Sequence, residues 1–194
     1  MPKTDCRKYR RASGVVLVNP EGLVLLGMGS WKPHFWRMPQ GGIDAGETPE
    51  ETIGRELMEE TGVLNFCIIG KASRPYTYDY PALHACSSSW RKTYKGQSIT
   101  WFHARAFSSK TDHEKYVPLG DEPEFIKLSW VNPAVAIART HSKLYGDSVT
   151  KQRQESYKNV FSEFGLPLYL HTAPIRRKYE RISSNILLAE HASL

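Results

Sequence analysis

Three glutamates, Glu56, Glu59 and Glu60, are the residues of this sequence whose spacing best fits chemistry. On a helix, where successive residues turn by about 100°, all three lie within a sector of about 100°. Carboxylates held this close repel one another unless a cation neutralises them. Mg²⁺ and Mn²⁺ are hard cations that take oxygen ligands and keep bound waters for a phosphate substrate. The simpler alternative is a solvated acidic face on which Arg55 supplies an ion pair.

The distribution of charge along the chain bears on this choice. Residues 41–63 contain seven acidic residues and one basic residue, a local charge of −6 in a chain whose net charge is +6, so the remaining residues carry +12. So many like charges in a short segment need either full solvation or a cation. A divalent cation within basic surroundings would suit a polyphosphate or the end of a nucleic acid.

The helix that positions the glutamates has clear start and stop signals. Thr48 is suited to the N-cap, Pro49 to the first helical position, and Glu51 completes a capping box with Thr48. Gly62 is a typical residue just beyond a helix C-terminus. The sequence therefore predicts a helix over residues 49–61.

The rest of the chain alternates between strand-like and helix-like segments. Two β-rich runs, residues 14–19 and 23–28, flank the turn at 19–22 and predict a hairpin. Trp101 and Phe102 are neighbours in one predicted strand, so we expect one of them to face the core. Hairpins and mixed segment lengths favour a mixed α/β sheet. Further strands are predicted at 66–70, 98–107 and 125–131, helices at 132–141 and about 149–164, and loops at 29–46, 86–97 and 108–123.

Composition limits the class of protein. Hydrophobic residues make up 40% of the 194 residues, enough for a core, and the longest apolar runs, 15–18 and 134–138, are far too short to cross a bilayer. Residues 1–13 lack the apolar stretch of a secretory signal. Three cysteines without metal-like spacing indicate free thiols in a reducing compartment. We therefore expect an intracellular protein, cytoplasmic with mitochondrial as the alternative. His34, His103 and His141 show no metal spacing and are expected to be ordinary.

The segment that contains the three glutamates resembles a known family signature. It reads Gly41-x5-Glu47-x7-Arg55-Glu56-Leu57-x-Glu59-Glu60-x-Gly62-Val63 and matches every fixed position of the Nudix box. The resemblance to Nudix hydrolases implies an α/β/α sandwich with a mixed β-sheet and a loop-helix-loop metal site. It also implies hydrolysis of a nucleoside diphosphate linked to another group.

The same resemblance implies roles for individual residues. Glu56 and Glu60 would be the principal ligands of Mg²⁺, with Mn²⁺ as the alternative ion, and a backbone carbonyl near Gly41 would complete the metal shell. Glu59 would be a further ligand or the base that orients the attacking water. Two other residues of the box are expected to be structural, since they pair with each other: Glu47 and Arg55.

Sequence outside the box resembles one branch of the family. Residues 36–43 look like the stretch before the box in bacterial RNA 5′-pyrophosphohydrolases and plant-type diadenosine polyphosphate hydrolases. On this resemblance Glu124 would be an additional metal ligand and a second candidate for the base. Arg10, Gln40 and Tyr78 would contact the substrate. The residues themselves also allow a solvated Arg10, a Tyr78 in the core or at its rim, and a Glu124 that faces water.

The last predicted helix departs from the pattern of the branch. Where the branch has an aromatic residue and a lysine, this chain has Gln152 and Arg153. Arginine can replace lysine as a phosphate contact. Glutamine cannot stack on a purine as phenylalanine would, so recognition of a base must differ here.

These observations combine into one prediction and one alternative. We expect a basic N-terminal arm (residues 1–13), a Nudix domain (14–168) and a basic C-terminal tail (169–194) that offers a surface to a protein partner. The predicted activity is Mg²⁺-dependent hydrolysis of phosphoanhydride bonds in RNA 5′-triphosphate ends or dinucleoside polyphosphates, with no DNA specificity and no membrane association. The alternative is a weakly catalytic or non-catalytic Nudix module that binds RNA or nucleotide within a ribonucleoprotein assembly.

Overall fold

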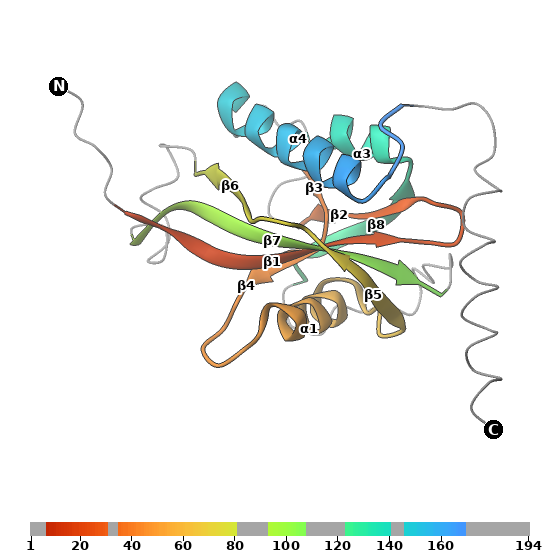
Figure 1. Ribbon diagram of the computed structural model, residues 1–194, viewed down its shortest axis with the longest axis horizontal. Helices are drawn as coiled ribbons and strands as arrows, with labels where there is room; N and C mark the ends of the chain where they lie inside the picture. Colours follow the sequence, from red (N-terminus) through yellow and green to blue (C-terminus); the bar gives the residue numbers. More distant parts are fainter. Residues whose placement is uncertain (1–6, 31–34, 81–92, 108–122, 141–145, 170–194) are drawn as a thin grey trace.

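The computed structural model describes residues 7–30, 35–80, 93–107, 123–140 and 146–169. A mixed sheet lies between helix α1 on one face and helices α3 and α4 on the other (Figure 1). This arrangement confirms the predicted α/β sandwich. The elements in chain order are β1 (Lys8–Val18), β2 (Val24–Gly29), β3 (Trp36–Arg37), β4 (Gln40–Gly42), α1 (Pro49–Thr61), β5 (Phe66–Lys71), β6 (Tyr76–Asp79), β7 (Tyr94–Ala106), β8 (Phe125–Val131), α3 (Pro133–Arg139) and α4 (Gly146–Glu163).

The long strands β1 and β7 form the centre of the sheet. They pair in parallel from Lys8 opposite Tyr94 to Val18 opposite Arg105, whereas the other pairings are antiparallel. The path through the sheet is β3-β2-β1-β7-β5, with β4 on β1, β6 on β7 and β8 on β2. The predicted hairpin between β1 and β2 is present, and its turn contains Gly22 at φ 77°.

Each face of the sheet has its own hydrophobic core. Trp101 packs on the α4 side with Tyr157 and Phe161, whereas Phe102 packs on the α1 side with Ile53. Trp101 and Phe102 are each 1% exposed. One of the two was expected to face the core; both do, because neighbouring strand residues point to opposite faces of the sheet and both faces are covered.

Helix α1 begins and ends as the sequence predicts. The Thr48 hydroxyl accepts a hydrogen bond from the Glu51 backbone N–H at 3.2 Å, and the Glu51 carboxylate accepts one from the Thr48 N–H at 2.8 Å. Gly62 closes the helix in the left-handed conformation at φ 70°, which costs glycine little. Ile53 and Leu57 are fully buried and anchor the helix to the sheet.

Three short strands and two boundaries differ from the sequence predictions. Strands β3 and β4 lie inside the segment expected to be a loop, and β6 was not predicted. Residues 94–97, expected to be a loop, begin β7, and residues 8–13, expected to belong to a basic arm, begin β1. These strands are specified by pairing partners elsewhere in the chain.

Some predictions concern residues that lie outside the part of the chain that the structure describes. They are Cys6, Cys86, His34, His141, loop residues 86–92 and 108–122, and tail residues 170–194.

Among the described residues, the structure contains no helix that combines the length and apolar character needed to span a membrane.

Candidate active site

Helix α1 presents the predicted glutamates at different depths. Glu56 is 7% exposed and Glu60 2% exposed, whereas the side chain of Glu59 is 44% exposed. The Glu56 carboxylate lies where a Cβ atom of Gly41 would stand, so no larger residue fits at Gly41 without moving it. Strand β4 and helix α1 are thus in close contact at this point. Glu56, Glu59, Glu60 and the nearby Glu124 are called the acidic cluster below.

Arg55 fastens one side of the acidic cluster to the loop before α1. Its guanidinium binds both carboxylate oxygens of Glu47, at 2.8 and 3.0 Å, and donates to the Gly42 carbonyl at 3.0 Å. Its remaining nitrogen donates to Glu56 at 2.8 Å and Glu59 at 3.1 Å. The arginine therefore orients two members of the cluster while its own position is fixed by Glu47.

Arg37 of β3 holds the other side of the cluster, and sequence reasoning gave it no role. Its Nη2 atom donates to Glu60 Oε1 at 2.6 Å and also forms an ion pair with Glu124 Oε2. The guanidinium lies 4.8 Å from the centre of the Phe125 ring. Arg37 is the charged residue of the segment 36–43, and this charge was the signal in the sequence that could have marked it as a site residue.

The pKa values of the two buried acids of the cluster, Glu56 and Glu60, shift in the opposite direction from that of the structural Glu47. Burial raises the pKa of Glu60 well above its usual value, against the opposing charge of Arg37, and the Glu124 and Glu56 charges raise it further. Burial likewise raises the pKa of Glu56, opposed by Arg55. The hydrogen bond from Arg55 instead lowers the pKa of Glu47 to about 2. Buried acids that repel one another are typical of functional sites. The charge of Glu47 is instead compensated by Arg55, as expected for a structural ion pair.

A second group of side chains forms a hydrogen-bonded network on the α4 side of the sheet. The Tyr78 hydroxyl donates to Gln97 Oε1 and accepts from Arg153 Nη2 at 2.8 Å. Gln40 Nε2 donates to the same Gln97 oxygen at 3.1 Å. We call Gln40, Tyr78, Gln97 and Arg153 the polar cluster. Gln97 was missed as a candidate because it lies between Gly96 and Ser98 at the end of the predicted loop 86–97, where the sequence carries no signal of a functional strand residue.

Gln40 joins the two clusters. Its backbone N–H donates to Glu60 Oε2 at 3.0 Å, while its side chain belongs to the polar cluster. The neighbouring Met38 N–H donates to the Tyr157 hydroxyl at 2.9 Å, and burial raises the pKa of Tyr157 to about 12. A neutral phenol of helix α4 therefore anchors the segment that carries Arg37 and Gln40.

Arg10 and Gln152 take different positions relative to these clusters. The Arg10 side chain lies against Gly42, on the strand that leads to the acidic cluster. Gln152 accepts a hydrogen bond from the Asp79 backbone N–H at 2.9 Å and so covers the end of strand β6. Gln152 is thus used to hold β6, whereas Arg153 stacks over the rings of Tyr78 and Phe35 at 4.5 and 4.8 Å.

The donor atoms of the acidic cluster fit a hard divalent cation. Four carboxylates and the carbonyls of the adjoining strand β4 offer the oxygen ligands that such ions prefer. In the part of the chain that the structure describes, no three Asp, Glu, His or Cys side chains already stand as a metal-binding group. The carboxylate oxygens of the acidic cluster are instead paired with Arg37 and Arg55. The match to a divalent cation therefore lies in the oxygen ligands and the negative charge of the cluster.

The sequence of this chain also matches a known protein family. The family model of the NUDIX domain matches residues 8–150. The chain belongs to the Nudix family. It is a Nudix hydrolase, an enzyme of the pyrophosphohydrolase kind, and this family generally depends on a divalent metal ion.

Several proteins are similar to this Nudix hydrolase over most of its length. The protein named RNA pyrophosphohydrolase of Zymomonas mobilis is 34% identical over 84% of this chain and 99% of its own, and its namesake in Afipia carboxidovorans is 38% identical over 67% and 81%. Nudix hydrolase 26, chloroplastic, of Arabidopsis thaliana is 34% identical over 80% and 69%.

Solved structures show the same fold at low sequence identity. The MutT protein from Methanosarcina mazei Go1 superimposes with a TM-score of 0.54 at 17% identity, covering 83% of this chain and 99% of its own. A binary complex of the Caenorhabditis elegans Ap4A hydrolase gives a TM-score of 0.50 at 19% identity, covering 78% and 98%. At such identities the likeness concerns the fold alone.

Proposed function

We propose that this Nudix hydrolase removes phosphate or pyrophosphate from the 5′-triphosphate end of RNA in a Mg²⁺-dependent reaction. The observation that carries the proposal is the junction at Gln40, where the acidic cluster meets a polar cluster rich in hydrogen-bond donors. A phosphate chain needs both: acids that can hold a divalent cation, and neutral or positive groups along its length.

The acidic cluster would hold the ion through Glu56, Glu60, Glu124 and a carbonyl near Gly41. A bound divalent ion would neutralise charge that develops on the phosphoryl oxygens and lower the pKa of a coordinated water. Mn²⁺ could take the same oxygen ligands.

Glu59 is the proposed general base. Among the three acids that α1 contributes to the acidic cluster it is the most exposed, and its hydrogen bond to Arg55 at 3.1 Å keeps it oriented. The attacking water would give its proton to Glu59 as its oxygen bonds to phosphorus, and the P–O bond from that phosphorus to the bridging oxygen would break, with its electron pair going to the bridging oxygen of the other product. Glu124 is the weaker candidate, since this proposal uses its carboxylate to hold the metal ion.

The polar cluster would bind the phosphate chain. Arg153 supplies a positive charge beside the Tyr78 hydroxyl, and Gln40 lies between this pair and Glu60. Arg10 approaches from strand β1 beside Gly42. Together these side chains would neutralise and orient phosphates that extend from the acidic cluster.

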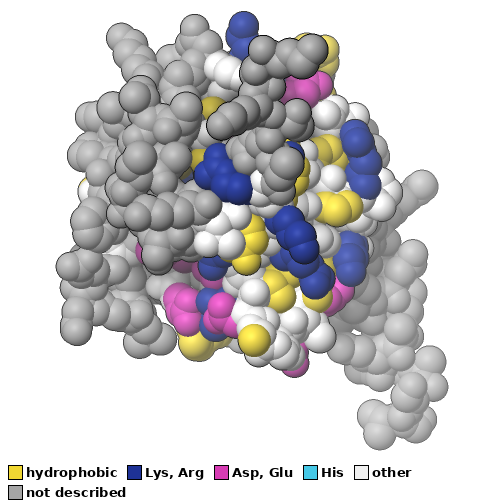
Figure 2. Space-filling view, turned by 90° about the vertical axis from the view of Figure 1, so that its left-hand side faces the viewer, with side chains coloured by type: hydrophobic (Ala, Val, Ile, Leu, Met, Phe, Trp, Pro, Cys, Tyr) yellow, Lys and Arg dark blue, Asp and Glu magenta, His cyan; other side chains and the backbone are white. Residues whose placement is uncertain are grey.

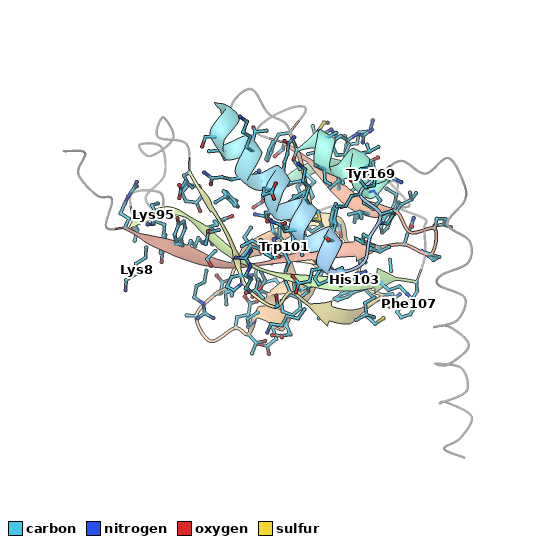
Figure 3. All side chains as sticks on the ribbon, turned by 45° about the horizontal axis from the view of Figure 1, so that its top comes forward. Lys8, Lys95, Trp101, His103, Phe107 and Tyr169 are labelled. Atoms are coloured by element: carbon cyan, nitrogen blue, oxygen red, sulfur yellow. The ribbon has the colours of Figure 1, made fainter. Side chains whose placement is uncertain are left out.

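Two observations favour RNA over a dinucleoside polyphosphate. The bacterial relatives that match most of this chain carry the name RNA pyrophosphohydrolase. The end of the sheet where β1 and β7 begin also bears Lys8 and Lys95 (Figure 3), and the view of this end in Figure 2 shows Lys and Arg side chains gathered with hydrophobic ones between them. Such a surface suits the repeated phosphates of an RNA chain.

A panel of hydrolysis reactions tests the proposal. Full-length protein with Mg²⁺ is given 5′-triphosphate RNA, 5′-diphosphate RNA, capped RNA and diadenosine tetraphosphate. The comparison variants are Glu59→Gln/Glu60→Gln and, as control, Glu50→Gln, since Glu50 lies on the same helix but pairs with Lys71 at 3.1 Å. We expect release from RNA ends by the wild type and the control, and loss in the double variant.

Each alternative predicts a different result. Preference for diadenosine tetraphosphate would assign the enzyme to dinucleoside polyphosphates. If the wild type and Glu59→Gln/Glu60→Gln are equally inert on every substrate but both bind RNA, the non-catalytic binding module becomes the better account.

A further inference from the structure

Arg37 stands between two of the acids that the proposed function assigns to the metal. A single nitrogen of its guanidinium contacts Glu60, on helix α1, and Glu124, just before strand β8. Glu60 is buried, whereas Glu124 is 62% exposed, so Arg37 spans the distance from the interior of the site to its mouth. The side chain of Arg37 itself is 18% exposed and rests on the Phe125 ring.

The two arginines of the site are held in different ways. Arg55 is fixed by two hydrogen bonds to Glu47 and one to the Gly42 carbonyl, none of which involves the acidic cluster. The polar partners seen for Arg37 are Glu60 and Glu124, both members of that cluster. A cation that takes oxygens from Glu60 and Glu124 therefore competes with Arg37 directly but leaves the anchor of Arg55 intact.

We propose that Arg37 is a displaceable counter-cation: it holds Glu60 and Glu124 together and must give up their oxygens when a divalent ion takes them. This inference rests on the proposed function, because it assumes that these acids hold the metal. Arg37 relieves repulsion between two carboxylates from distant parts of the chain, and it thereby lowers the affinity of the site for metal. Arg37 is a positioning residue that sets this affinity.

Metal affinity without substrate is the direct test. Binding of Mn²⁺ to the full chain is followed by the electron paramagnetic resonance signal of free Mn²⁺ for the wild type, Arg37→Gln and Arg37→Lys. We expect Arg37→Gln to bind Mn²⁺ about tenfold more tightly, since one charge-assisted hydrogen-bonded partner no longer competes. Arg37→Lys keeps the charge but loses the planar fork, and its Kd should fall between the two.

Arg139→Gln is the matched control. It removes an arginine next to the same strand, but Arg139 stacks on the Trp36 ring at 5.0 Å and contacts the Ser129 hydroxyl at 3.4 Å. Its Kd for Mn²⁺ should equal that of the wild type. In a chelator, Arg37→Gln should melt at a lower temperature than the wild type, and saturating Mn²⁺ should raise its Tm by a larger increment.

The possible results separate this inference from the proposed function. If Mn²⁺ binds the wild type and Arg37→Gln equally, or binds the variant more weakly, the inference is overturned while the metal site stands. If Mn²⁺ binds neither, the metal site and the inference both fail. Should Arg37→Gln not fold, Arg37→Lys must still bind more tightly than the wild type, and a Kd that is unchanged or higher overturns the inference.

Discussion

The two halves of the candidate active site are built in different ways. Three of the four acids in the acidic cluster lie on one helix, within a continuous segment that also supplies Arg55, Glu47 and the capping residues. The polar cluster draws its members from β4, β6, β7 and α4. The first half is encoded locally and the second is assembled by the fold, so changes to each should have different consequences.

The largest loss of activity is expected from a change at Gly41, where β4 packs closely against the acidic cluster on α1. Gly41→Ala would place a Cβ atom on the Glu56 carboxylate and force it to move. We expect kcat/KM for 5′-triphosphate RNA to fall by more than about 100-fold, because misplaced ligating groups cost at least as much as lost supporting ones. Steady-state hydrolysis rates measure the effect.

Gly54→Ala is the control for this change. Gly54 lies on α1, and beyond the helix's own backbone nothing lies within 4 Å of an added Cβ, so alanine should leave the rate unchanged and stabilise the helix by about 0.5–1 kcal/mol. Equal activity of the two alanine variants would contradict the proposed position of Glu56.

Removing the anchor of Arg55 should have a smaller effect. Glu47→Gln eliminates the bidentate ion pair at 2.8 and 3.0 Å, so Arg55 no longer orients Glu56 and Glu59 as firmly. Loss of such a supporting residue typically costs about 10- to 100-fold in activity. The measurement is kcat, with Glu50→Gln as the control; a rate within twofold of the wild type would show that Glu47 is dispensable.

The polar cluster should tolerate the loss of one hydroxyl better. Tyr78→Phe leaves Gln97 and Arg153 without their shared partner but keeps the ring under Arg153. We expect about a tenfold drop in kcat/KM, mainly through KM, because the other donors remain. Tyr76→Phe removes a hydroxyl that bonds Glu163 at 3.1 Å, away from the site, and should leave KM unchanged. If both variants behave alike, the polar cluster does not bind substrate.

Outside both clusters, His103 should affect stability but not catalysis. It stacks on Phe164 at 5.0 Å, and burial lowers its pKa from 6.5 to about 4. Between these two values the unfolded chain binds more protons than the folded one, so the free energy of unfolding falls as the pH is lowered from about 6.5 to 4. The slope contributed by His103 is at most about 1.4 kcal/mol per pH unit.

Denaturant titrations across this pH range measure the effect. His103→Phe removes the titrating group, so its stability should depend less on pH than that of the wild type. Parallel pH profiles for the two proteins would show that His103 does not titrate in this way.

The contrast between local and assembled structure also explains what the sequence could predict. The cap at Thr48, the stop at Gly62 and the hairpin turn are properties of a few adjacent residues, and all three are present as expected. Strands of two to four residues, such as β3 and β6, carry too little pattern of their own. They exist because β2 and β7 offer them backbone partners.

The same reasoning applies to the site. The family signature indicated the acids of α1, but it could not show that Arg37 joins Glu60 to Glu124, since that contact depends on how β3 and the segment before β8 meet. Gln97 likewise has a role only because Tyr78 and Gln40 arrive from other strands.

The most direct test of the account is the rate of phosphate and pyrophosphate release from a 5′-triphosphate RNA in Mg²⁺, measured for the wild type and Glu60→Gln. If the acidic cluster holds the metal, we expect rapid release by the wild type and no release in a chelator. Glu60→Gln should retain the fold but release phosphate and pyrophosphate more than about 100-fold more slowly. A Glu60→Gln protein that hydrolyses the RNA as fast as the wild type would contradict it.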